Sequence, residues 1–205
     1  MITALFTSML NIAYAETVSQ QWSGRFQISG FSFTGSVPGT ITFGPDNQSQ
    51  IALVRPSGIP IMSVTILSDQ VCFQFDMDDV QYRGTLEEFA ALSDNALPAH
   101  TIPLLFSPDM NVEPNAWTWQ STPKQPVRKL TIESNDALFL QAKYPNWTKD
   151  NTRPKRLSIQ LEPNMWTLRA NFKEVSEVPW TATCEGAEDI QVQPLTEMLK
   201  SIPKK

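Results

Sequence analysis

The chain is poor in the residue types on which metal sites depend. Its 205 residues include one histidine, His100, and two cysteines, Cys72 and Cys184. One histidine excludes a three-histidine zinc site and an H-E-x-x-H protease helix. Two cysteines exclude zinc ribbons and disulfide-dense small folds. The formal net charge of −5 is opposite to the basic footprint of nucleic-acid-binding proteins. We therefore expect no metal, no cofactor and no nucleic-acid partner.

The sequence also lacks an arrangement that would support catalysis. His100 has no acidic neighbour and no G-x-S-x-G motif with which to complete a triad. Asp76, Asp78 and Asp79 follow a predicted strand, but their spacing has neither the glycine turn nor the distal glutamate of a calcium loop. A solvated turn explains them better. We therefore expect that the protein is not an enzyme.

Long apolar runs are missing, and none reaches the roughly 20 residues that span a bilayer. Residues 1–15 read MITALFTSMLNIAYA and end in the small-x-small sequence Ala13-Tyr14-Ala15. This pattern is typical of a secretory signal peptide, although no Lys or Arg precedes the apolar stretch. An N-terminal core helix is the alternative. We expect cleavage after Ala15, which leaves Glu16 where a bacterial lipoprotein would carry its lipidated cysteine.

Export would place the two cysteines in an oxidising compartment, where disulfides persist. A bond between Cys72 and Cys184 would close a loop of about 110 residues, worth roughly 4 kcal/mol of unfolding free energy in the chain-entropy model. We expect this disulfide. Two buried free thiols are the alternative.

Strand-forming sequence is abundant, with apolar and polar residues alternating between turn signals such as Pro38-Gly39 and Pro163-Asn164. The predicted strands cover residues 25–33, 40–43, 51–54, 61–67, 71–75, 116–120, 129–133, 137–144, 156–161 and 166–172. Strands joined by short turns predict a mainly β fold with one meandering antiparallel sheet.

Helix signals are few. Thr85-Leu86-Glu87-Glu88 is a capping box. Residues 99–106 predict a short second helix. Residues 193–202 predict a third, with Pro194 at a plausible first helical position.

A curved sheet with few helices must bury its inner face, and alternate side chains of each strand point to that face. The residues predicted to point inwards from four strands are Val64, Ile66, Val71, Phe73, Phe75, Trp117, Trp119, Leu138 and Leu140. The first helix would add Leu86, Phe89 and Leu92, and the second would add Ile102, Leu104 and Leu105. Together these residues line either an apolar cavity suited to an acyl chain or an ordinary packed core.

The densest basic stretch lies late in the chain and is interleaved with Tyr144 and Trp147. Its members are Lys143, Lys149, Arg153, Lys155 and Arg156. A solvated connecting loop is the simpler interpretation. A patch for anionic lipid headgroups is the alternative.

Six segments, taken in order, resemble a known family. They are Gln21–Phe26 (QWSGRF), Ile51–Gly58 (IALVRPSG), Tyr82–Phe89 (YRGTLEEF), Leu97–Leu104 (LPAHTIPL), Pro154–Leu161 (PKRLSIQL) and Trp166–Ala170 (WTLRA). Over about residues 20–175 the chain resembles the LolA/LolB superfamily of bacterial lipoprotein carriers and outer-membrane receptors. The similarity is greatest to the receptor branch, LolB.

The resemblance implies an unclosed barrel of about ten or eleven antiparallel strands, lidded by short helices over an apolar cavity. It divides the chain into a signal peptide (1–15), a half-barrel domain (16–175) and a C-terminal extension with a short helix (176–205). It implies a non-enzymatic, monomeric protein that binds acyl chains of lipoproteins or other lipids in the periplasm or at the outer membrane. A periplasmic carrier protein is the implied protein partner.

Two departures bear on delivery of a lipoprotein to the membrane. The receptor is itself lipidated, whereas Glu16 stands at the corresponding position here. The receptor's x-P-L-G loop projects a leucine towards the membrane, and the matching residue is Ser57, for which Ile59 can substitute. The resemblance thus makes Ser57, Gly58 and Ile59 a candidate membrane-facing loop. A scaffold protein with a filled barrel is the alternative function.

Overall fold

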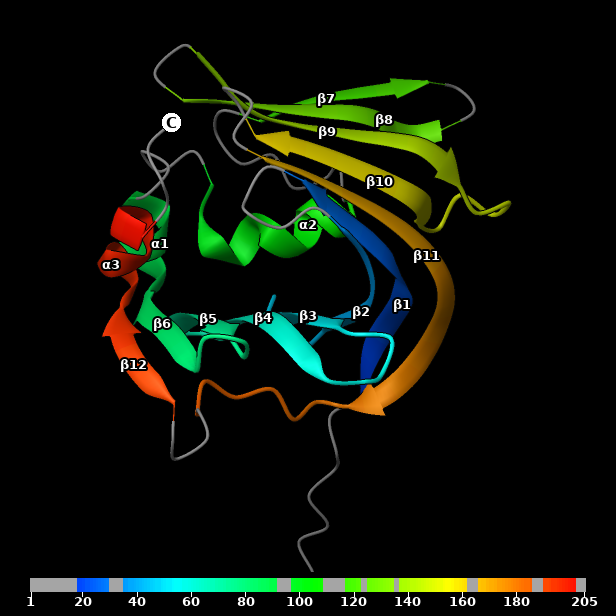
Figure 1. Cartoon of the computed structure of the whole chain (residues 1–205). Coiled ribbons are helices and arrows are strands. Elements are labelled where there is room, and N and C mark those ends of the chain that lie inside the picture. Colours follow the sequence, from blue (N-terminus) through cyan, green and yellow to red (C-terminus); the bar gives the residue numbers. More distant parts are fainter. Residues whose placement is uncertain are drawn as a thin grey trace, which may run out of the picture.

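One curled sheet of twelve strands dominates the computed structural model of the chain (Figure 1). The structure describes residues 18–29, 35–91, 97–108, 117–122, 125–134, 137–161, 166–185 and 190–201; the expected signal peptide lies outside them. The strands are β1 (Val18–Ser29), β2 (Gly35–Phe43), β3 (Ser49–Val54), β4 (Pro60–Ile66), β5 (Gln70–Phe75), β6 (Val80–Thr85), β7 (Trp117–Thr122), β8 (Gln125–Ser134), β9 (Ala137–Trp147), β10 (Pro154–Leu161), β11 (Trp166–Pro179) and β12 (Gln191–Pro194). The helices are α1 (Leu86–Ala91), the 3-10 helix η1 (Ala99–Thr101), α2 (Ile102–Phe106) and α3 (Leu195–Ser201).

The strands follow the order β12-β6-β5-β4-β3-β2-β1-β11-β10-β9-β8-β7 across the sheet. Two meanders, β1 to β6 and β7 to β11, are joined through the long β1–β11 pair. In the described part of the chain the edge strands β12 and β7 do not pair with each other, so the barrel stays open. The predicted mainly β, unclosed barrel with short helices is confirmed.

The sheet curves along the β1–β11 pair (Figure 1). The pairing register shifts between Ser23 and Gly24, which marks a β-bulge. A Cβ atom at Gly24 would lie 2.4 Å from the Asn171 carbonyl oxygen. Only glycine allows the two backbones to approach this closely, and the bulge curves both strands around one concave face (Figure 1).

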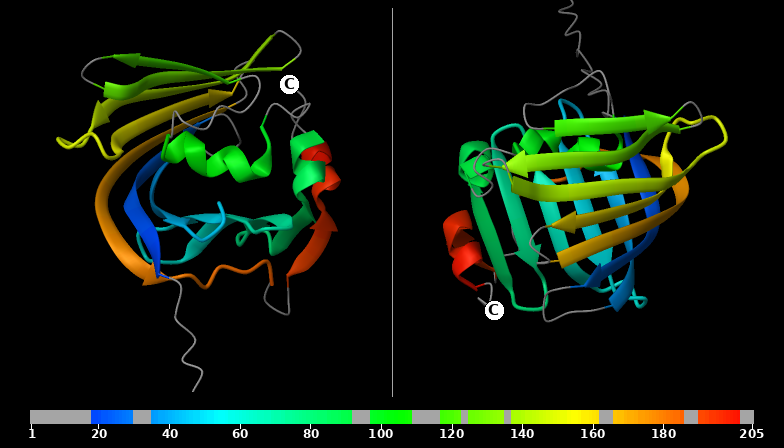
Figure 2. Two further views of the ribbon diagram at one scale, coloured as in Figure 1. Left: turned by 180° about the vertical axis from the view of Figure 1, so that it is seen from behind. Right: turned by 90° about the horizontal axis from the view of Figure 1, so that it is seen from above.

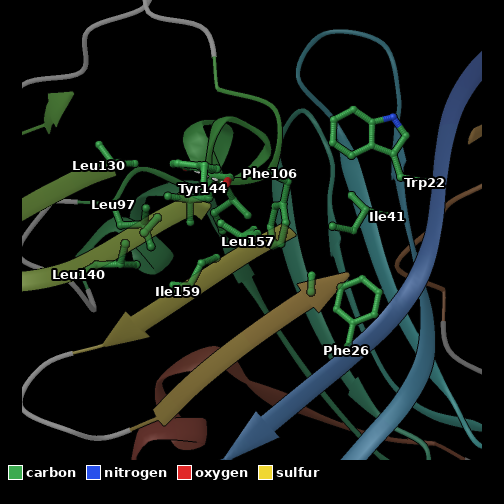
Figure 3. Close-up of a cluster of buried hydrophobic side chains, with 14 of the residues drawn as sticks. Trp22, Phe26, Ile41, Leu97, Phe106, Leu130, Leu140, Tyr144, Leu157 and Ile159 are labelled. Carbon is green, nitrogen blue, oxygen red and sulfur yellow. Dashed lines mark hydrogen bonds between the residues drawn. The ribbon is translucent and has the colours of Figure 1, made fainter. Parts of the chain in front are cut away.

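The hydrophobic core fills this concave face, which α2 covers from inside the curve of the sheet (Figure 1). Strands β1 to β5 and β7 to β11 contribute side chains to it, so both meanders reach the same core. Figure 3 shows Trp22, Phe26 and Ile41 on one side of the core and Tyr144, Leu157 and Phe106 on the other.

The capping box at the start of α1 is confirmed. The Glu88 backbone N–H donates to Thr85 Oγ1 at 3.1 Å, and the Thr85 N–H donates to Glu88 Oε2 at 2.8 Å. The residues predicted for the second helix form η1 and α2. Among the described residues, no helix is long and apolar enough to cross a membrane.

Two expectations for the C-terminal region are wrong. The third helix begins at Leu195, because Gln193 and Pro194 belong to β12. The sheet is also not wholly antiparallel, since β12 runs parallel to β6, with Gln191 opposite Val80 and Pro194 opposite Arg83. Both differences have one cause. The chain crosses the sheet before residue 191, so residues 191–194 pair with β6 in the same direction and the helix can begin only after them.

The crossing segment, residues 180–185, is called the strap. It leaves the end of β11 and passes over the outer face of the sheet towards β12 (Figure 1 and Figure 2). A disulfide joins Cys184 of the strap to Cys72 of β5, with an S–S distance of 1.96 Å and a Cα–Cα distance of 5.8 Å. The Arg83 guanidinium donates to the Cys184 carbonyl. The residues beyond 175 therefore continue β11 and extend the same sheet.

Candidate functional site

The predicted inward set of β4 and β5 lies on the concave face. Val64 pairs with Phe73, and Ile66 pairs with Val71. Val64 and Ile66 are buried, and Val71 is 0% exposed. Phe73 and Phe75 are partly buried, so the apolar surface becomes more open towards the β5–β6 turn.

The second meander contributes to the same core. Trp117 is buried, and the ring centroid of Trp119 lies 5.6 Å from that of Trp117. Leu140 of β9 is 1% exposed. The backbone of Leu138 pairs with that of Glu133, but its side chain lies outside the described part of the structure.

Two of the three residues predicted for the first lid helix lie in the described part of the chain. Leu86 and Phe89 of α1 are partly buried against the core. The Phe89 ring stacks on Phe73, with centroids 6.0 Å apart and an interplanar angle of 19°. The lid residue Leu92 lies outside the described residues. Helix α1 thus covers the side of the concave face formed by β5.

The second part of the lid, η1 and α2, lies deeper than α1. Ile102 and Leu105 are buried, and Leu104 is partly buried. Pro103 stands in the first turn of α2, where its missing N–H costs no helical hydrogen bond. Helix α2 therefore acts as an apolar plug, with side chains directed into the core.

Tyr144 of β9 holds α2 in place through a hydrogen bond that the sequence did not predict. Its hydroxyl donates to the Leu105 carbonyl at 2.9 Å. Complete burial raises the pKa of the phenol well above its usual value, so the hydroxyl keeps its proton. The available signal was weak: Tyr144 shares the inward alternation of Leu140, and a buried tyrosine hydroxyl usually finds a partner.

The concave face is occupied by the protein's own side chains. Two surface hollows, of about 350 and 260 Å³, lie on the outer face instead, along β1 to β3 and beside the strap. None of the predicted cavity residues lines either hollow. Where the structure describes the concave face, its apolar side chains pack against one another and lie apart from both hollows.

The candidate membrane-facing loop is a well-formed turn. The Gly58 N–H donates to the Arg55 carbonyl at 2.8 Å, and Gly58 has a φ of +85° that favours glycine. Ser57 and Gly58 are exposed, and Ile59 is 54% exposed. Met77, in the β5–β6 turn at the same end of the sheet, is 60% exposed. Two apolar side chains thus project from this end.

Few of the described polar side chains are candidates for catalysis or metal binding. His100 is exposed in η1. Asp76 accepts a hydrogen bond from Gln74 Nε2 at 2.6 Å, which fits the predicted turn. Within the described ranges, no group of three or more His, Cys, Asp or Glu residues is placed to hold a metal ion.

Comparison with known sequences finds no relative: no family model and no curated protein matches the chain.

The chain is similar to several solved structures at low sequence identity. A DUF1329 family protein from Desulfovibrio piger is 12% identical, with 79% of this chain and 86% of that chain covered and a TM-score of 0.50. A domain described as an outer membrane lipoprotein-sorting protein, from Vibrio parahaemolyticus, is 7% identical, with coverages of 80% and 86% and a TM-score of 0.47. A LolA superfamily protein from Nitrosomonas europaea is 8% identical, with coverages of 79% and 86% and a TM-score of 0.45. The similarity to the Desulfovibrio piger protein supports the open-barrel fold.

Proposed function

We propose that this protein is a non-enzymatic lipid-binding protein of the LolA/LolB superfamily that takes up an acyl chain against its concave face. The observation that carries the proposal is an apolar concave face covered by two short helices in place of a second sheet. The ordered sequence resemblance over about residues 20–175 adds the ligand class, acyl chains of lipoproteins or other lipids.

Uptake would require α2 to move, because its side chains fill the space. An acyl chain can replace them at low cost, since it exchanges one apolar surface for another. About ten buried methylenes would contribute roughly 8 kcal/mol before association costs of several kcal/mol are subtracted. The specific contact that opening breaks is the hydrogen bond from Tyr144 to the Leu105 carbonyl.

The test is displacement of an apolar fluorescent probe by a lipid. We expect saturable binding of the probe, with a dissociation constant in the micromolar range, and its release by a triacylated lipopeptide. Mass spectrometry of lipid extracted from the purified protein would identify the natural ligand. Absence of saturable binding would contradict the proposal.

The alternative is a scaffold protein with a permanently filled barrel. The tightly buried α2 side chains, Ile102, Leu105 and Phe106, favour this reading. It predicts that α2 amides exchange with solvent as slowly as those of the core strands. Lipid binding predicts faster exchange in α2 and protection when the probe is bound.

We predict that Tyr144→Phe weakens the attachment of α2 to β9. The change leaves the Leu105 carbonyl without its donor and should lower the free energy of unfolding by about 1 kcal/mol. Probe uptake, followed by stopped-flow fluorescence, should become faster. Tyr82→Phe is the matched control, because the Tyr82 ring packs against Phe75 on the partly open side of the core. Equal uptake rates in both variants would show that this hydrogen bond does not restrain α2.

We also predict that Ile59 contacts membranes. Ile59→Asp should weaken binding to phosphatidylcholine vesicles on the order of tenfold, because an exposed aliphatic side chain can no longer enter the interface. Vesicle sedimentation measures the effect. Val18→Asp is the control, since Val18 is 63% exposed at the opposite end of the sheet. If both variants lose the same amount of vesicle binding, the loop at residues 57–59 does not contact the membrane.

The same proposal places the mature protein in the periplasm, as a monomer that meets a carrier protein or the outer membrane. Its basis is the cleavage pattern at Ala13-Tyr14-Ala15 and the Cys72–Cys184 disulfide. Cell fractionation, together with determination of the mature N-terminus, tests the location.

A further inference from the structure

The β9–β10 hairpin holds Arg153 in a defined position. The Thr148 N–H donates to the Arg153 carbonyl at 2.9 Å, and the Arg153 N–H donates to Thr148 Oγ1 at 3.2 Å. Asp150 stabilises the turn by accepting from the Thr152 N–H at 3.2 Å. These bonds fix the backbone of Arg153 at the last turn residue before β10.

The Arg153 side chain reaches the hydrophobic core. Its guanidinium carbon lies 5.7 Å from the centroid of the Trp22 ring, and Trp22 is buried within the core cluster. Figure 3 shows Trp22 beside Ile41 at the margin of that cluster. A cation over an indole face is attractive, which explains how the charge is tolerated at this point.

One donor of this guanidinium is not satisfied. Arg153 Nη1 is buried and has no hydrogen-bond partner among the described residues. A buried donor left unpaired is unfavourable, and a guanidinium matches carboxylate and phosphate oxygens well. The residue as a whole is partly exposed, so it lies where the core meets solvent.

The surroundings are also positively charged. Lys149 and Lys155 flank Arg153 in the hairpin and are exposed. Such a cluster raises the local concentration of anions. If an amphiphile placed its chain in the core and its headgroup at the edge of the core beside Trp22, the headgroup would contact Arg153.

We propose that Arg153 binds the anionic headgroup, a carboxylate or a phosphate, of an amphiphile whose acyl chain occupies the barrel. This inference rests on the proposed function and narrows its ligand class to anionic lipids. A carboxylate or phosphate oxygen would supply the acceptor that Nη1 lacks. The neutral acylated cysteine of a lipoprotein would not supply it.

The experiment measures displacement of the apolar probe from the full chain by palmitate, hexadecyl phosphate and hexadecanol, which share a chain length and differ in headgroup. The two anionic ligands should bind about tenfold or more tightly than hexadecanol, since hydrogen bonds to charged groups are the stronger ones. Arg153→Gln should abolish this preference and leave the affinity for hexadecanol unchanged. Arg156→Gln, at an exposed arginine of β10 three residues further along the chain, should keep the preference.

Thermal unfolding of each variant checks the fold. If Arg153→Gln is unstable, Arg153→Lys gives the answer, because it keeps the charge but loses the forked donors and should lose part of the preference. Equal affinity for anionic and neutral ligands in the wild-type protein would overturn this inference and leave the proposed function standing. Absence of binding by all three ligands would overturn both. If inorganic phosphate displaces palmitate at concentrations as low as hexadecyl phosphate does, the acyl chain adds nothing to binding, which would assign the site to free phosphate and overturn the lipid assignment.

Discussion

Leu140→Glu is expected to abolish lipid uptake and to destabilise the protein by more than about 4 kcal/mol. Leu140 is 1% exposed and lies on β9 between Ile132 of β8 and Leu161 of β10. The change removes the favourable transfer of a leucine side chain and places a carboxyl group in an apolar core with no partner. Urea unfolding, followed by tryptophan fluorescence, measures the loss.

The adjacent residue provides the control for this prediction. Gln141→Glu adds the same charge one residue away, where the strand alternation directs the side chain to the outer face. It should change the free energy of unfolding by less than about 0.5 kcal/mol. Equal destabilisation by both variants would mean that net charge, not burial at position 140, is responsible.

A lid variant separates binding from folding. Leu104 of α2 is only partly buried, so Leu104→Ala should weaken probe binding while most of the stability remains. Probe affinity should also be measured in the fraction of Leu140→Glu protein that remains folded. If it is unchanged both there and in Leu104→Ala, the protein is a scaffold with a filled barrel.

The strand pattern of the fold was predictable because its cause is local. Alternation fixes which side chains of β4 and β5 share a face, and Val64 and Val71 lie where period 2 puts them. The capping box at Thr85 likewise involves residues three positions apart. Such features need no knowledge of the rest of the chain.

The missed features depend on contacts between distant residues. Tyr144 and Leu105 are 39 residues apart. The Arg153 guanidinium packs over the Trp22 ring, although the two residues belong to different meanders of the sheet. Residues 191–194 form a strand only because the edge of β6 is available to them. Taken alone, Pro194 followed by an amphipathic segment indicates a helix start, which is why the helix was predicted two residues too early.

Removal of the disulfide by Cys72→Ala together with Cys184→Ala is expected to lower the free energy of unfolding by about 4 kcal/mol. The two residues are 112 positions apart, and in the chain-entropy model the bond restricts a loop of that size in the unfolded chain. Urea unfolding of the variant and of the wild-type protein in reducing buffer should give the same value. Thr183→Ala, at an exposed strap residue, is the control and should be near neutral.

The disulfide should matter most for the strap and β12, because the other contacts there are few. They include the Arg83 hydrogen bond to the Cys184 carbonyl, the four-residue pairing of β12 with β6, and the Gln191 N–H that donates to the Asp79 carbonyl at 2.9 Å. Hydrogen exchange in the double variant should therefore rise first in residues 180–185 and 191–194. The β1–β11 pair, which spans the whole of β1, should keep its protection.

Loss of β12 would also expose the edge of β6. An uncovered strand edge offers unpaired backbone groups to another molecule, and native proteins usually block such edges. We therefore expect the double variant to self-associate at lower concentrations than the wild-type protein, as measured by light scattering. If the variant loses about 4 kcal/mol of stability yet shows neither faster exchange in β12 nor association, the bond stabilises the chain through the unfolded state alone. Association with wild-type stability would instead show that the strap's main effect is to keep β12 on the edge of the sheet.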